Sequence, residues 1–364
     1  MILIKNGLVF SPEPLGKKDL LLSNVIEAVD DDVNVKNIEE IDAEKLFVTP
    51  GFIDMHLHIN GAGGEGGPAT RTLPLTPNDM IFNGITTVIG LLGTDGYTRS
   101  LFELLYQVRR MKAYGVNAYM LTGSYQVPSP TLTGSISKDI LIVPEIMGVK
   151  IALSDHRSSY PTRAQLIAIA SEARVSGMLS SKPGYVHAHM GDGKDYFDPI
   201  LDVVDHTEIP IKQFLPTHIE RNNTLFHKAV EFAMKGGNLD ITIEPEDKAK
   251  TLENIKFLLS KKVPIENITL SSDGNGSLSK FDNDGVLIEI TTSPVNSIID
   301  LFKYIYQNDQ SFTTQFLKAV TDNAAKRLGI KKGRIQKGYD SDLLLFDKKL
   351  KLVYVIINGK IFKI

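Results

Sequence analysis

Two histidines, His56 and His58, end the apolar segment 46–58 (LFVTPGFIDMHLH) and are the residues best placed in this chain to bind a metal. Side chains two positions apart on a strand point to the same side, so both imidazoles could reach one ion. An isolated His-x-His pair can also simply occupy a strand end without any ligand. The residues at the ends of the other expected strands therefore serve to distinguish these two interpretations.

Four further candidate ligands stand near the ends of other apolar segments: Lys150, His189, His218 and Asp273. Taken singly, each has an ordinary explanation, because a buried histidine often just satisfies a backbone group and Ser-Ser-Asp-Gly-Asn-Gly is a typical turn sequence. A barrel of parallel strands, however, brings the C-terminal ends of its strands together in one mouth. We therefore predict that these four residues and the His-x-His pair form one metal site.

Lys150 is the unusual candidate, because it lies among apolar residues in the segment 146–153 (IMGVKIAL), where an unpaired ammonium is costly to bury. One interpretation is a lysine that extends to an acidic partner. The other is that burial lowers its pKa, so that the neutral amine adds carbon dioxide. The resulting N6-carboxylysine would be an anionic ligand able to bridge two metals.

The elements that must position these residues alternate short β-branched runs with longer amphipathic stretches, as in a parallel α/β fold. Eight strands are expected at residues 46–58, 85–93, 117–125, 146–156, 185–191, 214–220, 239–244 and 268–273. Helical spacing of apolar residues predicts helices at residues 99–114, 162–176, 224–235, 246–261 and 296–306. The pattern predicts a distorted (β/α)8 TIM barrel.

Both ends of the chain differ from this pattern, because they contain short strands and no helical periodicity. In the C-terminal segment, Asn358-Gly359 is a strong hairpin signal. We expect residues 1–49 and 329–364 to form one small β-sandwich domain, with residues 50–328 as the catalytic barrel inserted between them.

The composition describes a globular protein, with 364 residues, a net charge of −3, 42% hydrophobic and 23% charged residues. The chain shows no apolar run of the roughly 18 residues needed to span a membrane and no signal-peptide pattern. Its interspersed charges argue against nucleic-acid binding. Without cysteine, any zinc must be held by histidine or oxygen ligands. We expect a cytoplasmic homo-oligomer that acts on small molecules and binds neither membranes nor nucleic acids.

The glycine-rich segment 61–67 (GAGGEGG), just after His58, is the first candidate for substrate recognition. Its spacing formally matches G-x-G-x-x-G, but the segment runs into Pro68 and opens no helix, which argues against a dinucleotide site. Glycines such as Gly63 let the backbone approach a ligand closely. Glu65 offers a carboxylate suited to a substrate ammonium.

Arg157 and Arg221 follow two of the expected strands, and their planar guanidinium groups could bind substrate carboxylates, with surface salt bridges as the alternative role. Thr94 and Ser277 add neutral hydrogen-bonding groups. One acid and two arginines together describe a small zwitterionic substrate with two carboxylates. A β-aspartyl dipeptide has this pattern, because its peptide bond runs through the side chain and leaves the α-amino and α-carboxyl groups free.

From residue 48 to residue 276 the chain resembles the isoaspartyl dipeptidases of the amidohydrolase superfamily. The shared motifs, in chain order, are PGFIDMHLH, GGEGGPATRT, GLLGTD, LTGSYQVPS, GVKIALSDHRS, KPG, HMGD, LPTHIERN, KGGNLDIT and LSSDGNGS. The His-x-His motif alone indicates only the superfamily, whereas the loop and arginine motifs indicate the subfamily.

The resemblance implies two Zn²⁺ per subunit with a shared set of ligands: His56, His58 and Asp273 on one ion, His189 and His218 on the other, and Lys150, carboxylated by CO2, bridging both. It also implies that Asp273 accepts the proton of the attacking hydroxide and donates it to the leaving amine. Tyr125 would hydrogen-bond the developing oxyanion, and Glu65 would bind the free α-ammonium.

The expected function is therefore that of a binuclear zinc metallopeptidase, a β-aspartyl dipeptidase. A cyclic-amide hydrolase of the dihydroorotase or hydantoinase type is the alternative, because it shares the ligand strands but has no ammonium for Glu65. A non-catalytic scaffold is a further alternative. The presence of a suitable residue at all six ligand positions argues against it. The remaining histidines that we considered, His156, His187, His206 and His227, are not expected to bind metal.

Overall fold

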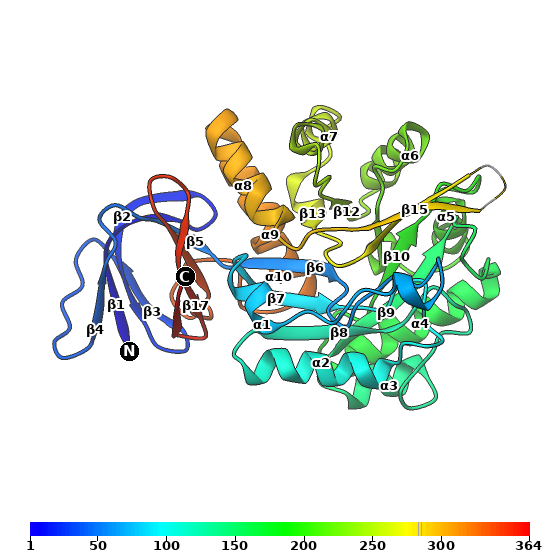
Figure 1. Cartoon of the computed structure of the whole chain (residues 1–364), viewed down its shortest axis with the longest axis horizontal. Coiled ribbons are helices and arrows are strands. Elements are labelled where there is room, and N and C mark those ends of the chain that lie inside the picture. The colour runs from blue at the N-terminus through cyan, green and yellow to red at the C-terminus, as the bar shows by residue number, and fades with distance from the viewer. Residues whose placement is uncertain (283, 285) are drawn as a thin grey trace.

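The structure is a computed structural model that describes every residue of the chain except 283 and 285. Two units lie side by side along its long axis (Figure 1). One is a mixed β-sheet to which both ends of the chain contribute, and the other is a parallel α/β unit. Candidate ligands belong to the second unit.

The mixed sheet has eight strands, in the order β18-β17-β16-β5-β1-β2-β3, with β4 pairing with β1. Its strands are β1 (Ile2–Phe10), β2 (Pro14–Leu22), β3 (Ile26–Asp30), β4 (Glu39–Asp42), β5 (Phe47–Pro50), β16 (Leu343–Phe346), β17 (Leu352–Ile357) and β18 (Lys360–Lys363). β16 pairs antiparallel with β5, which joins the two chain ends in one sheet. A packed sandwich and domain boundaries at residues 49 and 329 stay predictions.

The α/β unit contains a six-stranded parallel sheet of order β11-β10-β9-β8-β7-β6 and a parallel pair β12-β13. Its strands are β6 (Phe52–Leu57), β7 (Ile85–Gly90), β8 (Asn117–Gly123), β9 (Ile146–Leu153), β10 (Tyr185–Met190), β11 (Phe214–Thr217), β12 (Leu239–Thr242) and β13 (Ile268–Ser271). A parallel bridge between Leu57 and Gly274 connects the end of β6 with the segment that follows β13. The sheet is therefore curled, as expected for a barrel-type fold, and all eight expected strand regions contain one of these strands.

Helices cover the outside of this sheet (Figure 1). They are α1 (Pro77–Ile81), α2 (Leu101–Ala113), α3 (Ile136–Ile142), α4 (Arg163–Ser180), α5 (Asp198–Asp205), α6 (Asn223–Met234), α7 (Lys248–Ser260), α8 (Ser297–Asn308), α9 (Thr313–Val320) and α10 (Asp322–Leu328). The five predicted helices correspond to α2, α4, α6, α7 and α8. The helices that sequence analysis missed have at most 8 residues, which is too short for a helical period to stand out.

The predicted strand at residues 46–58 was wrong in one respect, because it is two strands that belong to different sheets. β5 pairs in the mixed sheet and β6 begins the parallel sheet, with Gly51 between them. Pro50 has no N–H to donate, and Gly51 donates its N–H to the carbonyl of Asp342 at 2.9 Å. A Cβ on Gly51 would lie 2.1 Å from the Thr86 hydroxyl oxygen, so the passage requires glycine.

After β13, the strands β14 (Ser277–Phe281) and β15 (Leu287–Thr292) pair antiparallel in a hairpin, and residues 283 and 285 between them lie outside the described residues. The Phe281 ring packs on the His156 imidazole with centroids 4.7 Å apart. The hairpin therefore lies against the segment that follows β9.

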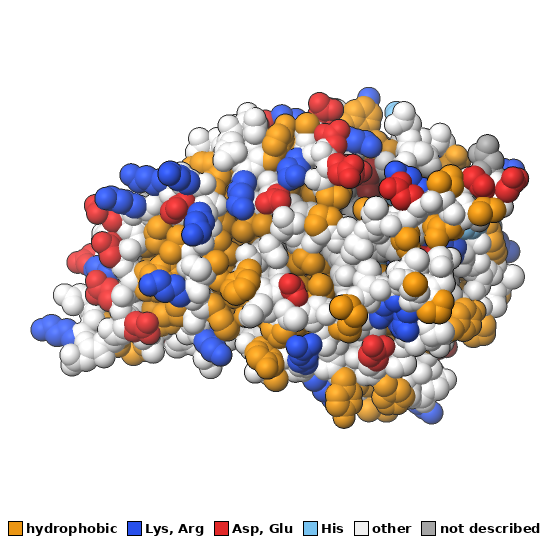
Figure 2. Space-filling view, viewed as in Figure 1, with side chains coloured by type: hydrophobic (Ala, Val, Ile, Leu, Met, Phe, Trp, Pro, Cys, Tyr) orange, Lys and Arg blue, Asp and Glu red, His pale blue; other side chains and the backbone are white. Residues whose placement is uncertain are grey.

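None of the helices in the described part of the chain is long and apolar enough to cross a bilayer. On the face that Figure 2 shows, Lys and Arg side chains are interspersed with Asp and Glu.

Candidate metal centre and substrate pocket

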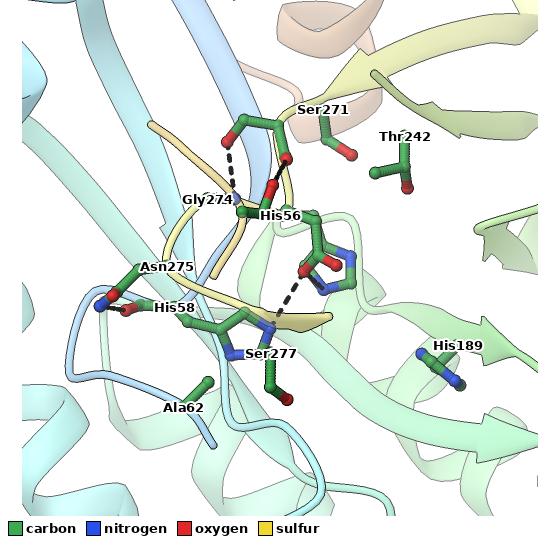
Figure 3. Close-up of polar contacts among 12 residues, drawn as sticks. His56, His58, Ala62, His189, Thr242, Ser271, Gly274, Asn275 and Ser277 are labelled. Carbon is green, nitrogen blue, oxygen red and sulfur yellow. Dashed lines mark hydrogen bonds and ion pairs between the residues drawn. The ribbon is translucent and has the colours of Figure 1, made fainter. Parts of the chain in front are cut away.

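All six residues predicted as metal ligands are buried, in or just after the parallel strands: His56 on β6, His58 after it, Lys150 on β9, His189 on β10, His218 after β11 and Asp273 after β13. One carboxylate oxygen of Asp273 lies 3.3 Å from Nε2 of His56 and 3.2 Å from Nε2 of His58. Lys150 Nζ lies 3.4 Å from His56 Nε2. Figure 3 shows His56 and His58 beside one another, with His189 across the site.

The second half of the cluster is formed by His189 and His218. Their ring centroids are 4.6 Å apart, and the His218 ring is 4.9 Å from that of His56. His189 Nε2 lies 2.8 Å from Oδ2 of Asp155, while its Nδ1 lies 2.6 Å from the Tyr125 hydroxyl oxygen. If Nε2 carries the proton and donates it to Asp155, the lone pair of Nδ1 can accept the hydroxyl hydrogen of Tyr125.

Burial sets the charge state of these ligands. It lowers the pKa of His56, His189 and His218 well below the usual histidine value, so the imidazoles are neutral, which is the form that binds metals. Burial also lowers the pKa of Lys150 to about 7. A substantial neutral fraction of this amine therefore exists near neutral pH.

Two of the candidate ligands stand in left-handed backbone, with φ of 61° at His218 and 49° at Asp273. Non-glycine residues adopt this conformation at a cost of about 1–3 kcal/mol, and they are enriched at functional sites. The turn at Asp273 is held by its own carbonyl, which accepts the N–H of Gly276 at 2.9 Å. His218 is held through Nδ1, which is 2.7 Å from the Thr242 hydroxyl oxygen.

Sequence analysis missed Asp155, a buried carboxylate that contacts both the candidate ligand His189 and Arg157 of the predicted substrate pocket. Besides its contact with His189, it accepts two hydrogen bonds from the guanidinium of Arg157, from Nε at 2.9 Å and from Nη2 at 2.8 Å, and one from the backbone N–H of Arg157 at 2.8 Å. Burial favours the neutral acid, but the hydrogen bonds from Arg157 and His189 outweigh it and hold the pKa of Asp155 well below its usual range. Its place two residues before Arg157 was the available signal.

His187 and Asp240 form a layer beneath the candidate ligands. His187 Nε2 lies 3.0 Å from His56 Nδ1, and potential ligand atoms of His56, His187 and Asp240 lie within 4.8 Å of one another. The Asp240 carboxylate accepts hydrogen bonds from three buried hydroxyls, those of Thr217, Thr269 and Ser271. This layer holds the His56 ring so that Nε2 faces Asp273.

Asp54 connects the first and last strands of the unit. Its Oδ1 accepts the N–H of His56 at 3.1 Å, and its other oxygen accepts the hydroxyl of Ser272. Because Ser272 immediately precedes Asp273, this contact fixes two candidate ligands relative to each other. The alternation of Asp54, His56 and His58 on one strand face was a signal for its role.

Glu65 and Arg157 form the core of the predicted substrate pocket. Oε1 of Glu65 accepts the hydroxyl of Ser277 at 2.8 Å and lies 3.5 Å from Nη1 of Arg157. The same Nη1 lies 3.4 Å from the hydroxyl oxygen of Thr94. Oε2 of Glu65 is buried and has no hydrogen-bond partner among the residues that the structure describes. An unpaired buried carboxylate oxygen is costly, so this atom is suited to a donor on a ligand.

Two cavities adjoin these groups. One, of about 340 Å³, is lined by residues that include His218, Asp273, Arg157, Arg221 and Ser277. The other, of about 490 Å³, is lined by residues that include Gly63, Glu65 and Thr94. Gly63 has φ of 76°, and a Cβ there would lie 2.3 Å from the carbonyl oxygen of Thr70, so the glycine is required. The structure thus brings the predicted substrate residues to the edge of the ligand cluster.

Tyr125 lies at the boundary between cluster and pocket. It is buried, and burial raises the pKa of its hydroxyl, which therefore remains a hydrogen-bond donor at neutral pH. The Arg157 guanidinium lies 5.5 Å from the centre of its ring.

Buried imidazoles and a carboxylate at the ends of curled parallel strands are the arrangement expected of an amidohydrolase. The model of the amidohydrolase family matches residues 47–362, and the chain belongs to this family. Over its full length the chain is similar to the crystal structure of the beta-aspartyl dipeptidase from Fervidobacterium islandicum AW-1 in complex with beta-Asp-Leu dipeptide. The two are 40% identical with a TM-score of 0.95, over 100% of this chain and 96% of that chain.

A second crystal structure of the Fervidobacterium islandicum enzyme is 38% identical, with a TM-score of 0.91 over the same shares of both chains. The resemblance to the isoaspartyl dipeptidases is confirmed by these two structures. Dihydroorotases match over shorter segments. The dihydroorotase of Aquifex aeolicus is 28% identical over 126 residues, which are 34% of this chain and 29% of that protein. The chain thus matches less than a third of the length of this curated relative.

Proposed function

We propose that this chain is a binuclear zinc metallopeptidase that hydrolyses the isopeptide bond of β-aspartyl dipeptides on a distorted (β/α)8 barrel. The observation that carries the proposal is the buried, unpartnered Oε2 of Glu65 beside the guanidinium of Arg157. A free amino acid head group, with its ammonium and carboxylate, would satisfy both groups at once. The similarity to a β-aspartyl dipeptidase crystallised with beta-Asp-Leu supports the same substrate class.

The buried cluster fits two metal ions. The imidazoles of His56, His189 and His218 are neutral, because burial lowers their pKa. The Asp273 carboxylate lies within 3.3 Å of both histidines on the β6 side. His56, His58 and Asp273 would hold one ion and His189 and His218 the other, with Lys150 between them. Bound zinc would polarise the scissile carbonyl and make a hydroxide available at neutral pH.

Lys150 would serve as a bridging ligand after carboxylation. Its neutral amine forms a bond to the carbon of CO2 and releases one proton, which leaves a carbamate with two oxygen atoms. The pKa of about 7 makes the neutral amine accessible. Without carboxylation, Lys150 would offer two metal ions only an uncharged amine, 3.4 Å from His56 Nε2, and a single neutral nitrogen cannot neutralise their charge.

Asp273 and Tyr125 would act on the reacting atoms. Asp273 lines the cavity, accepts the proton of the attacking hydroxide and donates it to the amine that leaves. Tyr125 donates its hydroxyl hydrogen to the oxygen of the tetrahedral intermediate. Its protonated state follows from its burial.

The charged pocket residues would place the substrate. Glu65 and Ser277 bind the α-ammonium end of the aspartyl residue, and Arg157 with Thr94 binds its α-carboxylate. Arg221, at the rim of the cavity, binds the carboxylate of the leaving residue. Gly63 allows the backbone close approach. A cytoplasmic location and a homo-oligomeric state complete the proposal and rest on the sequence alone.

The test is hydrolysis of β-Asp-Leu, α-Asp-Leu and dihydroorotate by zinc-loaded protein and by Glu65→Gln. We expect cleavage of β-Asp-Leu only, and a loss of about 10- to 100-fold in kcat/KM in the variant, because a hydrogen bond to a charged group contributes about 1.5–3 kcal/mol. Glu103→Gln, an exposed change on α2, is the matched control. Opening of dihydroorotate without cleavage of β-Asp-Leu would favour the cyclic-amide alternative. Failure to retain zinc would favour a non-catalytic scaffold.

A further inference from the structure

The outer wall of the 340 Å³ cavity is rich in carboxylates. Glu244 and Glu246, in the turn between β12 and α7, line the cavity. Neither Glu244 nor Glu246 forms an ion pair with any residue that the structure describes. Glu244 is half-buried, whereas Glu246 is exposed. Glu244 and Glu246 therefore line the cavity beyond the candidate metal ligands without an ion pair to a described residue.

The cations that line the same cavity are largely engaged. Arg157 is paired with Asp155 at 2.8 Å, and Lys280 is paired with Glu289 at 2.7 Å. Arg221 is assigned to a substrate carboxylate. Lys250, an exposed residue at the rim, is the remaining lining cation. With Arg221 so assigned, Glu244 and Glu246 outnumber Lys250 on this wall.

The order of groups along the pocket places the leaving residue against this wall. Glu65 and Arg157 fix the aspartyl head, and His218 and Asp273 flank the scissile bond. The residue released by cleavage must then lie on the side of Arg221, which shares the cavity with the acidic wall. The wall also contains apolar surface suited to a long aliphatic stem, from Pro245 and Leu278.

We propose that this enzyme prefers β-aspartyl dipeptides whose leaving residue carries a cationic side chain, lysine or arginine, and that Glu244 and Glu246 select it. This inference rests on the proposed function. The methylene groups of the leaving side chain pack on Pro245 and Leu278, and its ammonium or guanidinium reaches the two carboxylates. Neutral and acidic leaving residues lack this contact, and acidic ones are repelled.

The experiment compares kcat/KM for β-Asp-Lys, β-Asp-Leu and β-Asp-Glu at low ionic strength. We expect β-Asp-Lys to exceed β-Asp-Leu by about tenfold, since partly exposed charge pairs contribute about 1 kcal/mol each at most. The double variant Glu244→Gln/Glu246→Gln should bring this ratio close to one. Glu246→Lys should move the preference toward β-Asp-Glu. Glu253→Gln, an exposed change on α7 outside the cavity, should leave the wild-type ratio in place.

Added salt provides a second measurement, because screening weakens exposed charge pairs, so the Lys-to-Leu ratio should fall as ionic strength rises. The inference is overturned if β-Asp-Leu is cleaved at least as efficiently as β-Asp-Lys, or if the double variant keeps the wild-type ratio of kcat/KM for these two substrates. Either result would leave the proposed function intact. Failure to cleave any β-aspartyl dipeptide would overturn the proposed function as well. Thermal unfolding of each variant verifies that it is folded.

Discussion

Replacement of Asp155 by asparagine tests whether this carboxylate holds the candidate metal ligand His189 and the proposed substrate-binding residue Arg157 together. Asparagine keeps one acceptor oxygen but places an NH2 group opposite donors: either Arg157 Nε, which faces Oδ1, or both Arg157 Nη2 and His189 Nε2, which face Oδ2. Breaking a buried charge pair by removing one partner costs about 3–5 kcal/mol, and the retained acceptor should reduce this to about 2–3 kcal/mol. The free energy of unfolding should fall by that amount.

The same change should weaken the proposed metal site, because His189 loses the charged partner that fixes its ring. Groups that orient a metal-binding histidine typically change affinity by about 10- to 100-fold. Unfolding by urea gives the stability difference, and competition with a chelator gives zinc affinity. Asp202→Asn, which removes an exposed pair with Arg163 at 3.0 Å, is the control and should cost less than about 1 kcal/mol.

The sign of the pH dependence follows from the direction of the pKa shift. The pKa of Asp155 is depressed in the folded protein, so its stabilising contribution is complete above the unfolded pKa of about 3.9 and is lost as the pH falls through the folded value. The difference between wild type and Asp155→Asn should therefore be constant from about pH 5 to pH 8. Equal stability and equal zinc affinity of the two proteins at pH 7 would refute this role of Asp155.

Three further changes probe separate parts of the structure. His187→Phe removes the contact with His56 Nδ1, so the chelator concentration needed to strip zinc should fall by about 10- to 100-fold, unlike in His206→Asn at an exposed site. Reactivation of metal-free protein by zinc and bicarbonate should slow below pH 7, where Lys150 is protonated, and Lys150→Met should not bind a second zinc at any pH. Equal reactivation rates at pH 6 and pH 8 would contradict this. Gly51→Ala should destabilise the fold by about 1–3 kcal/mol in urea unfolding, because its Cβ would meet Thr86, and Thr86→Ala in the same chain should recover part of the loss.

The positions of the candidate ligands were predictable because a parallel α/β fold places functional residues at the C-terminal ends of its strands, and short apolar segments mark those strands in the sequence. His56, His58 and His189 each end a β-branched or apolar run, and the fold supplies their convergence. The burial of Lys150 was also predictable, because it lies in an otherwise apolar run, whereas its carboxylation stays a prediction. The residues around the site were recognisable only where motifs of the isoaspartyl dipeptidases marked them, as with Tyr125.

The contacts beneath the site could not be read from the sequence. His187 looks like any buried histidine, and its contact with His56 depends on the register between β10 and strands far away in the chain. Asp240 lies in a short strand whose neighbours supply its hydroxyl partners from β11 and β13. The division of residues 46–58 into the two strands β5 and β6 could not be predicted for a similar reason. The apolar pattern continues through Gly51, whereas the pairing partner changes from β16 to β7.

The junction at Gly51 also has a consequence for the order in which the molecule can be completed during synthesis. β5 obtains its partner on one side only when β16 has been made, and Ser11 likewise waits for Ile335, 324 positions later, to which its hydroxyl donates at 2.9 Å. The parallel strands from β6 to β13 are all translated before that point. A nascent chain therefore contains all the strands of the parallel unit, attached through one glycine to an incomplete sheet with an open edge, and an open edge favours wrong pairing.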